Sequence, residues 1–428
     1  MTPTIIRGCE HKPIADPIPE ECLEWLNRHD IDRKKADTLG LHEKSGGFAA
    51  GNYIGMVWLG ENNQAVLRVD SKFPDMNYVA MYTECMAHPT MYDRFDCLHV
   101  WPEQKLIDTS KHDFSILIVI TYLRELNKFC QRHMRRHFIR ERQNFIGKMK
   151  GKILVGENLR RNITHARPDR IYCEYQSVSD DILENQILRT ALERAARCVA
   201  EHRDRKNTLG ILQQWIRASR ATLRDVSTRH VKPSDFIAAR KRGAFAFYAR
   251  PLALAKAVLR QLGPNPKTEV LQTQTPPFAL NSAELFERYA GIRLMESFEE
   301  LLPGKNMNSH DAGDFNVTIR PDFYVPSEQT PRIIDAKYKD INFTDMEISD
   351  NNDEEHKPSQ DDIYQVVAYS QHHGLLRKMN CNNANLIKLG LAYPDKSTES
   401  VISKKQTRAF TSPLTVYGIP YPKNNEKK

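Results

Sequence analysis

The sequence predicts an α/β protein, α+β overall, in three segments. Residues 1–110 form a mixed α/β domain, residues 111–270 a largely helical one, and residues 271–428 a small domain whose helices flank a central mixed sheet. Three observations predict this arrangement. A chain of 428 residues is longer than a domain with a single hydrophobic core usually is. The hydrophobic periodicity changes near residues 111 and 280. Four prolines within residues 263–277 mark a linker.

The first segment contains a short helix and a hairpin. The helix is expected over residues 20–27, directly after Pro19. Alternating apolar residues predict strands over 53–59 and 64–69, joined by a turn at residues 60–63. No residues here have catalytic spacing, so we expect a binding or docking domain.

The middle segment is helical in its periodicity. Apolar residues recur on one face over 114–129, a second helix is expected from Ser179, and further helices over 208–226 and 233–260. A turn into a strand is expected over 150–155. A dense basic stretch follows the first helix, with arginines at Arg132, Arg135, Arg136, Arg140 and Arg142.

Charge is distributed unevenly along the chain. Residues 111–270 hold 33 Lys and Arg against 15 Asp and Glu, whereas both neighbouring segments are mildly acidic and the whole chain carries +8. Such a field attracts polyanions, of which nucleic acid is the commonest. The five arginines are therefore candidate DNA contacts. The alternative is an Arg-rich helical surface that pairs with acidic neighbours.

The third segment has the element order of a small α/β unit. A helix is expected over 282–301, short strands over 315–319, 322–325 and 333–338, a helix over 362–376 and a buried strand over 386–393. The acidic stretch over 345–362 is expected to be a solvated loop, with gating of a site as the alternative.

Several classes of protein are excluded by the sequence. No apolar run approaches the roughly 20 residues needed to cross a bilayer, and the N-terminus lacks the pattern of a secretory signal. The eight cysteines are scattered without metal-ligand spacing, which favours reduced thiols in the cytoplasm over disulfides or zinc. No GxxxxGK[ST] phosphate loop is present, so the chain is not expected to bind a nucleotide itself.

One constellation carries chemistry. Of four Pro-Asp dipeptides, only Pro321-Asp322 is followed at a suitable distance by an acid, any residue and a lysine, at Asp335 and Lys337. Two carboxylates on adjacent strands can bind Mg²⁺, or Mn²⁺ as the alternative. The metal would activate water and stabilise charge on a phosphodiester. Two positions apart on a strand, Asp335 and Lys337 face the same side.

Three further residues extend this PD-(D/E)xK pattern. Glu287 lies in the preceding helix, where it could be a third metal ligand, although an ordinary solvated acid is the alternative. Gln365 and Tyr369 stand four apart on a helix and share a face. They could contact the lysine or the DNA backbone, although a plain amphipathic helix is the alternative. The pattern thus has four parts in order: Glu287, Pro321-Asp322, Asp335 with Lys337, and Gln365 with Tyr369. A chance match to all four is much less probable than a chance match to any one of them.

At these residues the sequence resembles the McrC family, the nuclease subunit of 5-methylcytosine-dependent restriction systems. The resemblance covers roughly residues 110–395. It rests on Leu285-Phe286-Glu287, Arg320-Pro321-Asp322, Ile334-Asp335-Ala336-Lys337-Tyr338-Lys339 and Tyr364-Gln365 with Tyr369, and in the middle segment on Lys150-Gly151-Lys152-Ile153 and Ser179-Asp180-Asp181 with Asn185.

The resemblance implies a restriction-endonuclease-like fold for the third segment, and a Mg²⁺-dependent endonuclease activity on double-stranded, modified DNA. It also implies a partner, a McrB-like hexameric AAA+ GTPase that the first segment would engage. Two alternatives stay open. One is a RecB-like repair or recombination nuclease that works with a helicase. The other is a non-catalytic adaptor that stimulates a partner NTPase.

Overall fold

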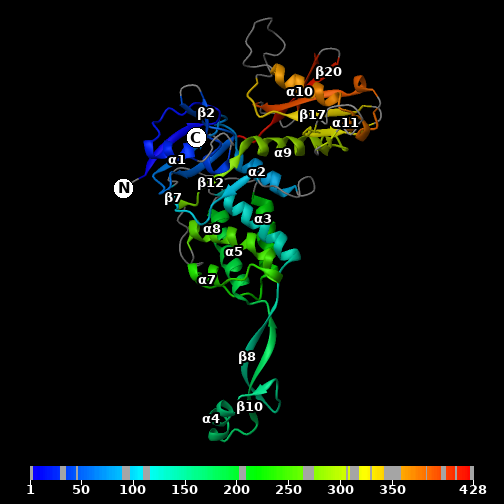
Figure 1. Ribbon diagram of the computed structural model, residues 1–428. Coiled ribbons are helices and arrows are strands. Elements are labelled where there is room, and N and C mark those ends of the chain that lie inside the picture. Colours follow the sequence, from blue (N-terminus) through cyan, green and yellow to red (C-terminus); the bar gives the residue numbers. More distant parts are fainter. Residues whose placement is uncertain are drawn as a thin grey trace. The chain divides into compact units, whose positions relative to one another are not determined.

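The chain folds into two compact units in the computed structural model (Figure 1). The structure describes residues 3–28, 35–44, 47–88, 97–108, 116–201, 209–263, 274–304, 307–308, 318–327, 330–341, 358–381, 383–396, 402–409 and 412–424. Unit 1 consists of Met1–Ile107 and Pro277–Lys428, and unit 2 of Asp108–Pro276. The first and third predicted segments therefore share one unit, with the second inserted between them.

The first sheet of unit 1 has the strand order β1-β5-β4-β12-β6. β1 (Thr4–Cys9) runs parallel to β5 (Ala65–Asp70), and β5 is antiparallel to β4 (Tyr53–Leu59), which confirms the predicted hairpin. β12 (Phe278–Asn281) lies antiparallel between β4 and β6 (Leu98–Val100). A strand from beyond the inserted unit thus completes the N-terminal sheet.

A glycine makes this pairing possible. Gly55 has φ +147°, and a Cβ added there would lie 2.2 Å from the carbonyl oxygen of Phe278. Only a residue without a side chain lets the two backbones approach so closely. Behind the sheet, Leu26 of α1 (Glu20–Arg28) and Ala279 of β12 belong to the same buried cluster. The smaller elements here are η2 (Ala36–Thr38), β2 (His42–Lys44) and β3 (Gly47–Ala49).

Helix α9 (Ser282–Met295) begins directly after β12. The side chain of Asn281 caps it by accepting a hydrogen bond from the backbone N–H of Glu284. It packs against α2 (Tyr78–Ala87), which the side chain of Asn77 caps in the same way. The predicted helix over 282–301 is therefore right in position but ends about six residues earlier.

The second sheet of unit 1 has the order β13-β16-β17-β18-β20-β19. β17 runs parallel to β18, and β18 parallel to β20, while the outer pairs are antiparallel, so the predicted mixed sheet is confirmed. Its strands are β13 (Leu302–Pro303), β16 (Phe323–Val325), β17 (Arg332–Ala336), β18 (Lys388–Asp395), β19 (Ser403–Ala409) and β20 (Ser412–Pro420).

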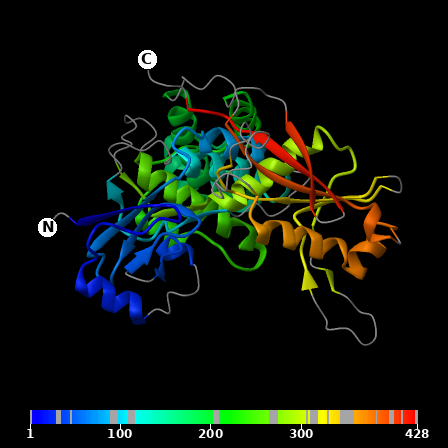
Figure 2. The same ribbon diagram turned by 90° about the horizontal axis from the view of Figure 1, so that it is seen from above.

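Helices α10 (Gln360–Ser370) and α11 (His373–Lys378) lie against this sheet (Figure 2). Val366 and Leu375 share a buried cluster with Ile333, Leu391 and Val416 of the central strands. Together the two helices take the place of the one predicted over 362–376. The remaining elements are β14 (Met307–Asn308), which pairs with β15 (Thr318–Ile319), and η8 (Ala384–Leu386). The loop predicted over 345–362 lies mostly outside the described residues.

Unit 2 contains a bundle of helices with its own core. α3 (Ile116–Arg132) packs against α5 (Leu183–Glu201), α6 (Leu209–Thr222) and α8 (Ala249–Leu262). α7 (Pro233–Ala238) and η5 (Gly243–Tyr248) precede α8, so helical structure covers most of the predicted range 233–260, in three separate elements. The helix predicted from Ser179 begins four residues later, because Ser179 ends a strand. β7 (Ile107–Asp108) and β11 (Gln274–Thr275) lie at the boundaries of the unit in sequence.

A long arm extends from this bundle (Figure 1). β8 (His137–Ile146) and β10 (Arg170–Ser179) pair antiparallel over their whole length, and β9 (Lys152–Ile153), α4 (Val155–Arg161) and η4 (Ile163–His165) complete the far end. The prediction of a largely helical segment missed this arm. Most side chains of β8 and β10 are exposed or half-buried, with Phe145 and Cys173 as the buried exceptions, so the sequence lacks the apolar alternation that marks a strand.

None of the helices in the described part of the chain combines the length and apolar character that crossing a bilayer requires. All eight cysteines are free thiols, and all but the half-buried Cys9 are buried.

Candidate active site

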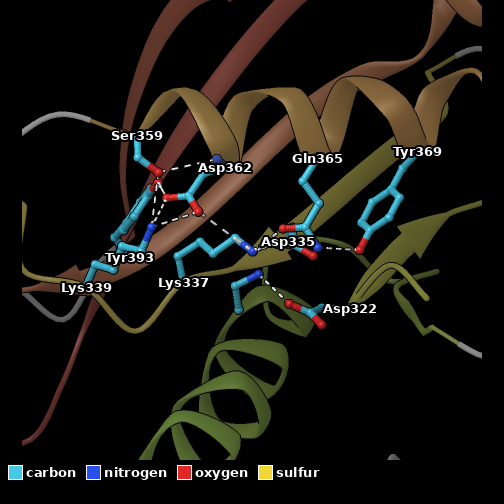
Figure 3. A network of polar contacts seen from close by, with 10 residues as sticks. Asp322, Asp335, Lys337, Lys339, Ser359, Asp362, Gln365, Tyr369 and Tyr393 are labelled. Carbon is cyan, nitrogen blue, oxygen red and sulfur yellow. Dashed lines mark hydrogen bonds and ion pairs between the residues drawn. The ribbon is translucent and has the colours of Figure 1, made fainter. Parts of the chain in front are cut away.

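Asp335 and Lys337 lie at the end of the central strand β17. Asp335 is 2% exposed, and the Nζ of Lys337 lies 2.6 Å from its Oδ2. The backbone N–H of Lys337 donates to the carbonyl of Ala392 at 2.8 Å, which continues the pairing with β18 past the end of the strand. The sheet therefore fixes both residues, and their side chains face α10 (Figure 3).

Asp322 reaches the same place from the neighbouring strand. It precedes β16, and its Oδ2 accepts a hydrogen bond of 2.7 Å from the backbone N–H of Ala336. Gly304 lies close to the peptide that links Pro321 to Asp322: a Cβ on Gly304 would lie 1.4 Å from the carbonyl oxygen of Pro321. The three residues of the Pro-Asp and Asp-x-Lys motifs are thus brought together, as the spacing predicted.

Gln365 and Tyr369 close the site from α10. Lys337 Nζ donates to Gln365 Oε1 at 2.6 Å, and Gln365 Nε2 donates to the Tyr369 hydroxyl at 2.6 Å (Figure 3). The predicted shared helix face is present, and it makes one continuous chain of contacts from Asp335 to Tyr369.

Glu287 lies on α9, close enough for its charge to act on both aspartates. Burial raises the pKa of Glu287, and the neighbouring Asp335 raises it further, while Arg288 and Arg320 oppose the shift. The structure therefore places the third predicted carboxylate in the electrostatic environment of Asp322 and Asp335.

Ionisation of Asp322 and of Asp335 is unfavourable in this site, because the pKa of each carboxyl is raised. Burial raises the pKa of Asp322 well above its ordinary value, and the carboxylates of Asp335 and Glu287 add to this. Burial also raises the pKa of Asp335, although Lys337 and a hydrogen bond with Asp322 oppose it. One buried and two half-buried carboxylates that raise one another's pKa form an environment that could hold a cation.

The donor set suits a hard divalent cation. Carboxylate oxygens are the ligands that Mg²⁺ and Mn²⁺ prefer. Apart from its ion pair with Lys337, the buried Oδ2 of Asp335 has no partner, so it becomes available as a ligand once Lys337 withdraws. As they stand, no three acidic, His or Cys side chains of the described residues are close enough to hold a metal.

A second carboxylate lies beside Lys337 and is not among the predicted site residues. Asp362, in the first turn of α10, is 4% exposed and lies 3.9 Å from Lys337 Nζ. It accepts hydrogen bonds from Lys339 Nζ at 2.8 Å and from the Tyr393 hydroxyl at 3.0 Å. Burial alone would raise the pKa of Asp362, but the contacts with Lys339 and Ser359 lower it. Asp362 is therefore a second acidic partner for Lys337 beside Asp335.

The sequence contains an ambiguous signal for Asp362. It follows Ser359 by three residues, the spacing of a helix N-cap, and the structure shows that the Ser359 side chain does cap α10. An acid at this position usually serves the helix dipole alone.

The five arginines of the basic stretch lie in unit 2, apart in sequence and in unit from these carboxylates. Arg132 ends α3, and Arg136 and Arg142 form ion pairs of 2.8 Å with Asp180 and Glu174. Arg140 lies on β8, and all five side chains are exposed. The stretch is therefore the base and first strand of the arm, where some charges are already paired.

Comparisons with known proteins point to one family. The model of a family described as "McrBC 5-methylcytosine restriction system component" matches residues 49–381, more than three quarters of the chain. That match includes every residue of the candidate active site. No curated protein matches.

Two solved structures are similar in part. One is a refined half-complex from a tetradecameric assembly of Thermococcus gammatolerans McrB AAA+ hexamers with bound McrC, at 14% identity and a TM-score of 0.43, covering 98% of this chain and 95% of that one. The other is the cryo-EM structure of the Thermococcus gammatolerans McrBC complex, at 16% identity and a TM-score of 0.32, covering 67% of this chain and 85% of that one. These TM-scores are too low to add to the description of the fold.

Proposed function

The chain belongs to the family of McrBC 5-methylcytosine restriction system components, and we propose that it is the endonuclease subunit of such a system. The observation that carries this proposal is the meeting of Asp322, Asp335 and Lys337 at one edge of the second sheet, with Gln365 in contact with the lysine. Carboxylates and a cation placed together in this way can support metal-dependent hydrolysis of a phosphodiester bond.

In this proposal Asp322, Asp335 and Glu287 hold Mg²⁺. The bound ion would supply a water of lowered pKa and offset charge on the scissile phosphate. The protein supplies the rest. Burial alone would lower the pKa of Lys337, but in the metal-free site Asp335 and Asp362 raise it above its ordinary value, so the lysine is protonated there. In this proposal Lys337 acts as a cation that stabilises the charge developing on the phosphate.

Gln365 and Tyr369 position that cation. A lysine side chain has four rotatable bonds, and a partner at 2.6 Å on a packed helix restricts them. When Lys337 leaves Asp335, Gln365 and Asp362 remain within reach to hold its ammonium group. This gives the lysine two defined positions.

We further propose that the chain works with a McrB-like hexameric AAA+ GTPase and stimulates it. The sequence has no phosphate loop of its own, so GTP hydrolysis must come from another chain. The first segment stays our predicted docking domain. The arm is a second candidate surface, because it exposes apolar side chains that a protein partner would cover: Phe138, Ile146, Met149, Val155, Leu159, Ile163 and Val178.

The test uses Asp335→Ala and Lys337→Ala in the full-length chain, mixed with its partner GTPase and methylated plasmid DNA. Both variants should cleave DNA at least about 10²–10³-fold more slowly, the loss expected when one group that stabilises the transition state is removed. GTPase stimulation should be unchanged, because neither residue lies on the arm or in the first segment. Asp340→Asn is the matched control, since Asp340 is an exposed acid three residues from Lys337.

Two outcomes would favour the alternatives. Cleavage that persists in both variants would rule out this active site. A wild-type chain that stimulates the GTPase but cleaves no DNA would favour the non-catalytic adaptor. Cleavage that depends on Asp335 but requires a helicase and not a GTPase would favour the RecB-like nuclease.

A further inference from the structure

Tyr338 follows Lys337 and connects the candidate active site to the first 80 residues of the chain. It is 7% exposed. Lys72 Nζ donates a hydrogen bond of 2.6 Å to its backbone carbonyl, and the hydroxyls of Tyr338 and Tyr78 lie 2.5 Å apart. The Tyr338 hydroxyl donates to Glu10 Oε2 at 3.3 Å. Both the backbone and the side chain of Tyr338 are thus held by residues more than 250 positions away.

Glu10 joins two elements of the active site. It is 1% exposed, and while one of its oxygens accepts from Tyr338, the other accepts from the hydroxyl of Ser282. Ser282 is the first residue of α9, the helix that carries Glu287. The same carboxylate therefore holds the residue after Lys337 and the start of the helix of Glu287.

The ring of Tyr338 packs against two phenylalanine rings. Its centroid lies 5.0 Å from that of Phe73 and 5.8 Å from that of Phe286, the residue before Glu287. Lys72 Nζ lies 4.2 Å from the centre of the ring. Replacing tyrosine by phenylalanine would leave this packing intact and remove only the hydroxyl.

These groups are buried at a cost. Burial raises the pKa of Glu10 and lowers that of Lys72 to about 8, which shows how poorly the surroundings solvate either charge. An apolar cluster of the same volume would hold these two segments together at least as strongly as the buried polar contacts do. What the polar contacts add is direction, since hydrogen bonds fix the orientation of the groups that they join.

We propose that Tyr338 is a positioning residue for Lys337 and Glu287, and that Glu10 and Lys72 of the N-terminal segment hold it in place. This inference rests on the proposed nuclease function and extends it. The N-terminal segment is then part of the catalytic apparatus, because it sets where the lysine and the metal ligand stand.

The first test is Tyr338→Phe, compared with Tyr421→Phe. The Tyr421 hydroxyl donates to Asp75 at 2.9 Å, so it also joins the N- and C-terminal segments, but it contacts neither β17 nor α9 by that bond. With partner GTPase, Mg²⁺ and methylated DNA, Tyr338→Phe should lower kcat on the order of tenfold with KM for DNA unchanged, since small displacements of catalytic groups cost up to about 10²-fold. Tyr421→Phe should cleave as the wild type does.

The second test is Glu10→Gln, alone and combined with Tyr338→Phe. Glutamine keeps the volume but has one acceptor oxygen for two hydroxyl donors. Because both changes break the same path, the double variant should be no slower than the slower single variant. Effects of the two changes that multiply would show independent, structural roles and overturn the proposal.

A readout without cleavage separates this inference from the proposed function. Mg²⁺ should raise the melting temperature of the wild type, and Tyr338→Phe should need more Mg²⁺ for half of that rise, while Tyr421→Phe should not. If the wild type binds Mg²⁺ but does not cleave DNA, the nuclease proposal fails and this comparison still decides the role of Tyr338. Identical Mg²⁺ curves for wild type and Tyr338→Phe, or losses that match Tyr421→Phe, would overturn the inference.

Discussion

The charge of Asp322 opposes folding until a cation arrives. Its pKa lies well above the ordinary value because it is buried beside Asp335 and Glu287. A group whose pKa is raised in the folded state favours folding in its protonated form. Ionising Asp322 therefore lowers the stability of the folded state. This loss is absent below the pH at which an unfolded aspartate titrates, grows as the pH rises, and is complete above the pKa of the folded state.

Asp322→Asn should therefore stabilise the metal-free protein at pH 8, and the gain should vanish as the pH falls to about 4. Asparagine keeps an oxygen that can accept from the backbone N–H of Ala336. The free energy of unfolding of the variant should therefore exceed that of the wild type at pH 8 and equal it near pH 4. Urea unfolding across a pH series would measure it, with the exposed Asp340→Asn as control.

Mg²⁺ provides a second check on the same variant. The ion should stabilise the wild type and not Asp322→Asn, because the variant lacks one of the proposed ligands. A variant less stable than the wild type at every pH would contradict the predicted charge repulsion.

Residues of the active site differ in how far the sequence could reveal them. Asp322, Asp335 and Lys337 can be predicted because strand alternation and motif spacing are local properties. Gln365 and Tyr369 follow from helix periodicity. Glu10 and Lys72 have no such signal. They meet Tyr338 only because two distant segments share a unit, and no local pattern in one sequence records that contact.

The same distinction holds at the scale of elements. The hairpin β4–β5 and the strands β16, β17 and β18 are predictable, because each has a buried face that imposes a pattern of apolar residues. The arm is not, since β8 is mostly exposed and rich in arginine. Its basic composition predicts a charged surface but does not identify the element that bears the charge.

The arm offers a test at this scale. Reversing the charges of Arg136, Arg140 and Arg142 should flatten the dependence of DNA affinity on salt, by about one unit of slope for each arginine that contacts a phosphate. Filter binding between low and moderate salt would measure the slope. The control reverses Arg217 and Arg224, exposed residues elsewhere in unit 2. An unchanged slope would show that the arm arginines serve only their ion pairs with Asp180 and Glu174.

At the scale of the whole molecule, the sequence predicts three segments and their order. It does not predict that the first and third segments fold into one unit. The predicted boundaries of the segments come from composition, periodicity and prolines, which mark where one segment gives way to the next. Pairing of β12 with β4 and β6 makes one unit of the first and third segments. β12 is four residues long, and so short an apolar run does not identify its partner strand.

This grouping predicts how fragments behave. A fragment of residues 108–276 should fold alone, because unit 2 has its own buried helical core. A fragment of residues 271–428 should not, because it would expose the apolar strand β12 and lose the partners of Ser282 and Tyr338. Circular dichroism and cooperative thermal unfolding would distinguish them. Cooperative unfolding of the second fragment, with added stability in Mg²⁺, would contradict the shared unit.

Completing the N-terminal sheet with β12 has a consequence during translation. One edge of the apolar strand β4 waits for residues that leave the ribosome more than 200 positions later. At about 5–20 residues per second, that edge stays open for roughly 10–40 s. An open apolar edge can pair with neighbouring nascent chains. The inserted unit thus imposes a delay in which the growing polypeptide depends on chaperones, or on low local concentration, to avoid aggregation.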